Sequence, residues 1–145
     1  MLPGFRKRGY TFARNGEHTT ALIHIQRSDT STKDALIYTL NFGIVVNRLA
    51  EALELDVMKC SVWEAHWTER IDGILGVNDD TWWQVIDEET LKLNCENLEN
   101  LIPNVALPWF EHWGTEDAMP NAWVIGRAAG LSDLLINKYL RILRA

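Results

Sequence analysis

The chain has 145 residues, 47% hydrophobic and 23% charged, with a formal net charge of −6. This length and composition exclude the disordered class and give enough apolar surface to fold as a single domain, 1–145, without a metal or a disulfide. The first 33 residues carry six Lys/Arg against two Asp/Glu, while the rest carries eight against eighteen. No long basic helix or stripe follows this basic start, so we expect no nucleic-acid partner.

The N-terminal sequence MLPGFRKRGY lacks the apolar segment of a signal peptide, and no apolar run reaches the length of a membrane span. We therefore expect a cytoplasmic protein with no membrane partner and with reduced thiols at Cys60 and Cys95. Cys95 falls on the apolar stripe of a predicted helix, which indicates a role in core packing.

The first half of the chain alternates with the period of β-strands. Gly9–Arg14 and His18–Arg27 alternate around Asn15-Gly16, a strong turn signal, and predict a hairpin. After a polar loop, the longest strand-like run covers Ala35–Val46. Three consecutive strands with short links favour an antiparallel meander.

A short helix is predicted from Asn47 to about Leu55. A fourth strand is predicted over Val62–Ile71, with Trp63 and Trp67 on one face, and a fifth over Trp82–Ile86.

The second half reads as helical. Asp87 is a plausible N-cap for a helix that ends at Pro103, because proline interrupts the helical hydrogen bonds. Leu107–Trp113 is predicted to form a further short helix, and Ser132 is predicted to cap a last helix that runs to Leu143. The predicted fold class is α+β: an antiparallel sheet of about five strands with C-terminal helices packed on one face.

One face of the predicted sheet gathers polar side chains from three strands. Period-two alternation places them together, and Trp82 and Trp83 follow as a candidate apolar wall. The candidate binding residues are His24, Gln26, Thr39, Asn41, His66, Arg70, Trp82 and Trp83, with Thr68 between the last strand's His and Arg. Such a set suits recognition of a carboxylate, an amide or a peptide backbone. The alternative is an ordinary solvated sheet face.

Catalytic and metal-binding signatures are weak. Cys60 lies six residues before His66, but nothing in the sequence brings the pair within hydrogen-bond reach. There is no C-x-x-C or H-E-x-x-H motif, so we expect no metal and no cofactor. The acidic pair Asp79-Asp80 fits a turn, and Asp87-Glu88-Glu89 fits a helix N-terminus.

Several local patterns together resemble a bacterial family known only as the domain of unknown function 4304 family. In chain order they are GFRKRGYTFAR (Gly4–Arg14), IHIQRS (Ile23–Ser28), LNFGI (Leu40–Ile44), ERIDGILG (Glu69–Gly76), DDTWWQV (Asp79–Val85) and LPWFEHWGTED (Leu107–Asp117). The resemblance implies an α+β fold and a cytosolic bacterial protein, and it brings no established activity. Family members usually have a helix before the Gly-Phe pair, and here only three residues precede it. A partner or a second copy is therefore an alternative cover for one sheet face or edge.

The leading functional hypothesis is a non-enzymatic module that binds a protein or peptide through the polar face. An immunity-type inhibitor fits a small acidic module, because acidic surfaces pair with basic enzymes. The alternative is a small-molecule-binding protein or weak hydrolase on the same face, with Arg70 as anion anchor and His66 or His24 as base. A third option is a homodimer formed through an exposed sheet edge.

Overall fold

Six strands form one antiparallel sheet in the computed structural model, which describes residues 3–78, 80–125 and 131–145. The strands are β1 (Arg6–Arg8), β2 (Thr11–Asn15), β3 (Thr19–Arg27), β4 (Leu36–Val46), β5 (Trp67–Arg70) and β6 (Trp83–Val85). Their order across the sheet is β1-β2-β3-β4-β5, and β6 pairs with the first residues of β4. The predicted meander and the α+β class are confirmed.

The hairpin between β2 and β3 closes at Gly16, whose N–H donates to the Thr19 carbonyl at 2.8 Å. Alternation along the strands then gives the sheet two distinct faces. One carries Phe12, Ile23 and Phe42 in a row and is called the helix face; the other carries Thr11, His24 and Asn41 and is called the outer face.

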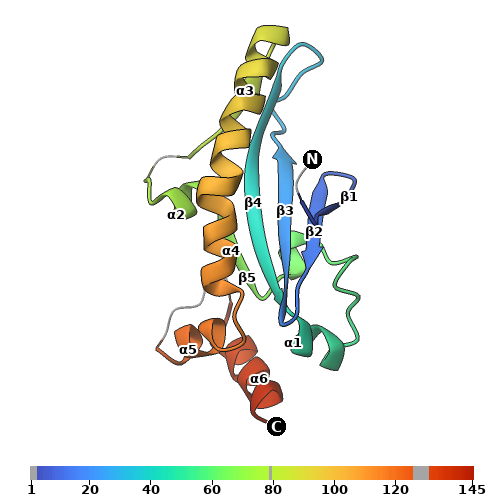
Figure 1. Ribbon diagram of the computed structural model, residues 1–145, viewed down its shortest axis with the longest axis vertical. Helices are drawn as coiled ribbons and strands as arrows, with labels where there is room; N and C mark the ends of the chain where they lie inside the picture. Colours follow the sequence, from blue (N-terminus) through green and yellow to red (C-terminus); the bar gives the residue numbers. More distant parts are fainter. Residues whose placement is uncertain (1–2, 79, 126–130) are drawn as a thin grey trace.

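The helix face packs against three consecutive helical segments, α3 (Glu88–Leu101), η2 (Ile102–Ala106) and α4 (Leu107–Trp113). They run as one rod along the sheet (Figure 1). Phe42, fully buried, lies with its ring centroid 5.9 Å from that of Phe110 and 6.3 Å from that of Trp109. The predicted packing of C-terminal helices on one sheet face is therefore correct.

Helix α3 ends at Leu101, close to the predicted end at Pro103, but the chain stays helical beyond it. Pro103 sits at the start of η2, a π-helical segment in which the Leu107 N–H donates to the Ile102 carbonyl, five residues back. The Asn104 side-chain amide donates to the Asn100 carbonyl at 2.8 Å. Proline removes one backbone donor from the helix. The wider π-helical turn and the Asn104 side chain satisfy backbone carbonyls there, so the rod continues.

The fourth strand is shorter than predicted. The 3₁₀ turn η1 (Val62–Glu64) precedes β5, because Glu64 and Ala65 donate to Ser61 and Val62 rather than to β4. Helix α2 (Ile71–Leu75) follows β5 directly. Arg6–Arg8, which lies before the first predicted strand, forms the exposed edge strand β1.

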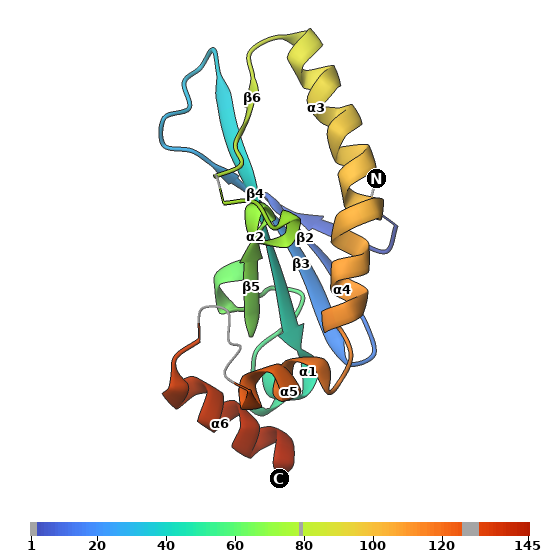
Figure 2. The same ribbon diagram turned by 90° about the vertical axis from the view of Figure 1, so that its left-hand side faces the viewer.

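Three further helices lie together at one end of the sheet (Figure 2). They are α1 (Asn47–Ala52), α5 (Ala118–Val124) and α6 (Asp133–Arg144). The predicted cap of the last helix is confirmed, since the Ser132 hydroxyl accepts from the Leu135 N–H. Within the described ranges, no helix has both the length and the apolar character needed to cross a membrane.

The outer face carries a second, smaller core beneath the segment that links α1 to β5. Its buried members are Ala13, Leu22, Val45, Ala50, Cys60 and Ala65. This linking segment covers only part of the outer face and leaves the polar side chains of β3, β4 and β5 beside it.

Candidate functional site

A row of polar residues crosses the outer face from one edge of the sheet to the other. The strand register aligns Arg8, Thr11, His24, Asn41 and Arg70 on five successive strands, and it aligns Gln26 with Thr39 in the next row. The predicted gathering of Gln26, Asn41 and Arg70 on one face is therefore correct. The same face carries Thr68, aligned with Gly43.

Several of these polar groups satisfy one another. The Asn41 amide donates to Gln26 Oε1 at 2.7 Å, and the Thr11 hydroxyl lies 3.0 Å from His24 Nδ1. Asn41 and Thr39 are buried, while His24 and Gln26 are half-buried. Within the described residues no hydrogen bond forms at the Gln26 amide nitrogen or at His24 Nε2. These two groups are the ones available to a ligand, and burial lowers the pKa of His24, so its ring is neutral at pH 7.

Trp63 flanks one side of this row because the turn that carries it packs closely against Gly43 of β4. A Cβ on Gly43 would lie 2.8 Å from Ala65 Cβ and 2.9 Å from Val62 Cγ2, so η1 packs directly onto the backbone of β4. The Thr68 hydroxyl holds η1 there by donating to the Val62 carbonyl at 3.1 Å. The Trp63 ring, 62% exposed, then lies edge-on to His24 with centroids 6.2 Å apart.

Trp82 flanks the other side of the row. The buried Thr39 hydroxyl donates to the Thr81 carbonyl at 2.6 Å, which fixes the segment that carries Trp82. The Arg70 guanidinium carbon lies 5.4 Å from the centroid of the Trp82 ring, within the range of a cation–π contact. We call His24, Gln26, Asn41, Arg70 and the two flanking tryptophans the tryptophan-flanked strip.

Two carboxylates neutralise Arg70. Its Nε donates to Asp72 at 2.9 Å, and its Nη2 lies 3.1 Å from Asp80 in an ion pair that lacks hydrogen-bond alignment. An incoming carboxylate would have to compete with both acids, so the strip favours amides and peptide backbone over anions.

His66 was predicted on this face and is instead buried at the end of the sheet, 1% exposed. Its Nδ1 accepts from the Val46 N–H at 2.9 Å, and its ring packs edge-on against Tyr139. Burial lowers its pKa to about 4. Because β5 begins only at Trp67, the alternation that placed His66 beside Arg70 does not extend to it.

Trp83 also departs from the prediction. The register pairs it with Tyr38, whose side chain points to the helix face, and the two rings stack with centroids 5.6 Å apart. Trp82 and Trp83 therefore point to opposite faces of the sheet, and only Trp82 lines the strip.

The groups considered for catalysis are dispersed. Cys60 is buried in the second core, where burial and the nearby Glu64 and Asp56 raise its thiol pKa. Among residues 3–78, 80–125 and 131–145 no three His, Cys, Asp or Glu side chains cluster as metal ligands. Of the acidic pair before Trp82, Asp79 lies outside the described residues and Asp80 pairs with Arg70. Asp87 caps α3 as predicted, accepting from the Thr90 N–H.

Sequence reasoning missed Trp63, which it assigned to the face of Trp67. The signal that could have revealed it is Gly43, the residue of the longest strand that leaves the outer face open for close approach.

Comparison with known proteins identified a family. The family model described as "Domain of unknown function (DUF4304)" matches residues 2–112. No curated protein and no solved structure matches the chain. The match covers most of the sequence and the whole sheet, and we conclude that the chain belongs to the DUF4304 family.

Proposed function

We propose that this protein is a non-enzymatic binding module that holds a protein or peptide partner against the tryptophan-flanked strip. One observation carries the proposal: Trp63 and Trp82 are 62% and 37% exposed on either side of hydrogen-bonding side chains. Tryptophan is enriched at interface positions that dominate binding energy, because its ring buries a large area and keeps one polar group.

The shape of the strip supports a macromolecular partner over a small molecule. Four pockets of the described residues lie elsewhere, and none of them is lined by a residue of the strip. Small-molecule sites are concave, whereas protein interfaces are broad and flat.

The alternative of a weak hydrolase on the same face has less support. Its proposed base His66 is buried and accepts a backbone hydrogen bond, and its proposed anion anchor Arg70 already pairs with two carboxylates. His24 alone remains half-exposed, with Thr11 as its only hydrogen-bond partner among the described residues. Thr11 is itself buried, 8% exposed, so its hydroxyl is poorly placed to attack a substrate as a nucleophile.

An inhibitor or immunity-type role in a cytoplasmic setting is the finer form of this proposal. The net charge is −6. Glu64 follows Trp63 in the sequence, and Asp72 and Asp80 both contact Arg70 beside Trp82. Such a surface suits a basic partner, whose association would then weaken as salt screens the charges.

The proposal is tested by affinity capture from cells of the source organism, followed by binding measurements with the purified captured protein. Trp63→Ala and Trp82→Ala should each raise Kd at least about tenfold, the usual effect of truncating an interface hot spot. Leu134→Ala is the control, since Leu134 is 80% exposed on α6, away from the strip. Equal Kd values for the wild type and both tryptophan variants would refute the proposal.

A further inference from the structure

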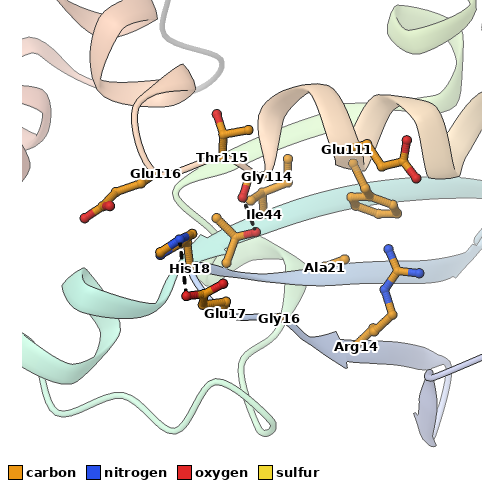
Figure 3. A pocket seen from close by; sticks show the side chains of 12 residues that line it. Arg14, Gly16, Glu17, His18, Ala21, Ile44, Glu111, Gly114, Thr115 and Glu116 are labelled. Atoms are coloured by element: carbon orange, nitrogen blue, oxygen red, sulfur yellow. Dashed lines mark hydrogen bonds and ion pairs between the residues drawn. The ribbon is translucent and has the colours of Figure 1, made fainter.

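A separate cavity opens on the helix face, between the β2–β3 hairpin and the C-terminal end of α4 (Figure 3). Its volume of about 470 Å³ lies within the range of small-molecule sites. The floor is apolar and comes from Ala21, Ile44 and Phe110, whereas charged side chains stand at the walls. None of the residues of the tryptophan-flanked strip lines this cavity.

Arg14 is the unusual residue of the cavity. The register aligns it with Ala21 and Ile44, so strand alternation places a cation on the face that otherwise builds the core. Its guanidinium carbon lies 4.9 Å from the centre of the Phe5 ring. A Cβ on Gly4 would lie 3.1 Å from Arg14 Cδ, so glycine there leaves room for the side chain. Arg14 is thus held in position by its neighbours.

Both Arg14 and Glu111 line this cavity. Within the described part of the chain, neither the Arg14 guanidinium nor the Glu111 carboxylate forms an ion pair or a hydrogen bond. Figure 3 shows them at the same end of the cavity, on β2 and α4. A positioned guanidinium and a carboxylate left unpaired in one cavity are the complement of a zwitterion.

The opposite end of the cavity is acidic. Glu17, His18 and Glu116 lie there (Figure 3). Glu116 pairs with Arg48 at 3.2 Å, and Glu17 lies 3.9 Å from His18. Only Glu116 has an arginine partner, so the Glu17 carboxylate leaves this end favourable for a further cation.

We propose that this cavity binds a free basic amino acid. The ligand carboxylate pairs with Arg14 and its α-ammonium with Glu111, while the aliphatic chain lies on Phe110 and Ile44 and the side-chain cation reaches Glu17 and Glu116. This site is independent of the proposed partner-binding strip, because the two lie on opposite faces of the sheet.

The test is isothermal titration of the full chain with L-lysine and with three analogues that each lack one charge. Cadaverine lacks the carboxylate, Nα-acetyl-lysine lacks the α-ammonium, and norleucine lacks the side-chain amine. Lysine should bind, and each analogue should bind at least about tenfold more weakly, as expected for loss of one charge-assisted contact.

Matched variants place the binding site. Arg14→Gln and Glu111→Gln should each weaken lysine binding at least about tenfold, while Arg14→Lys should restore part of it because it keeps the charge without the fork. Arg6→Gln, an exposed β1 residue, and Trp63→Ala should leave lysine binding unchanged. Urea unfolding of each variant checks that the fold is intact. Absence of lysine binding at millimolar concentration, equal binding of cadaverine, or binding that survives Arg14→Gln in a folded protein would overturn the proposal.

Discussion

The buried imidazole of His66 accepts a hydrogen bond from the backbone N–H of Val46, with 2.9 Å between Nδ1 and the amide nitrogen. An accepting Nδ1 carries no proton, so the proton of the neutral ring is on Nε2. Protonation of Nδ1 would break this bond and leave a charge in a site that is 1% exposed. Burial accordingly lowers the pKa of His66 to about 4.

This pKa predicts a pH dependence of stability. The unfolded chain binds a proton at His66 near pH 6.5, and the folded chain binds it only near pH 4. The contribution of the neutral His66 to folding stability is therefore complete above pH 6.5 and is lost as the pH falls towards 4. The full difference is at most about 3 kcal/mol. Urea unfolding of wild type and His66→Gln between pH 7 and 4.5 measures it. The wild type should lose more stability than the variant across this window; parallel pH profiles would contradict the assignment.

The contact of η1 with β4 predicts a strong effect at Gly43. Gly43→Ala introduces a Cβ within 3 Å of Ala65 Cβ and Val62 Cγ2, so it should lower the free energy of unfolding by about 1–3 kcal/mol. The displaced η1 should also change the fluorescence of Trp63. The control is the double variant Gly43→Ala/Ala65→Gly, which removes one of the two clashes and should recover part of the stability. Wild-type stability in Gly43→Ala would show that η1 does not pack as described.

The sheet could be predicted from sequence because β2, β3 and β4 alternate without interruption and their connections are short. The same rule failed at residues 62–66, where a 3₁₀ turn has no period-two signature and reverses the assignment of Trp63 and His66. Arg14 lies two residues after Phe12 in the same strand, so the alternation already placed its side chain on the helix face. The sequence could not predict that Arg14 lacks an ionic partner, because the residues that could pair with it lie on α4, about a hundred residues away in sequence.

The adjacent tryptophans Trp82 and Trp83 provide a comparison of the two faces. Trp83→Ala removes a ring that stacks on Tyr38 and packs against the main core, so it should cost about 2–4 kcal/mol of unfolding free energy. Trp82→Ala removes a ring that is 37% exposed and should cost less than about 1.5 kcal/mol. Chemical denaturation of both variants measures the difference. Equal costs, or a larger cost at Trp82, would contradict the register of β6 against β4.

The two cysteines predict a split in thiol reactivity. Cys95 was expected in the core but is exposed, at the wall of an apolar groove between the sheet and α3 that also includes Phe12, Ile25 and Leu98. Cys60 is 2% exposed and its thiol pKa is raised by burial, so little reactive thiolate forms.

In native protein at pH 7.5, a chromogenic disulfide reagent should therefore modify one thiol rapidly, and the second should react only as fast as the protein opens. Cys95→Ser should remove the rapid phase, whereas Cys60→Ser should leave it unchanged. In denaturant the wild-type thiols should both react rapidly. Two rapid phases in native wild-type protein would show that the segment over the outer face does not bury Cys60.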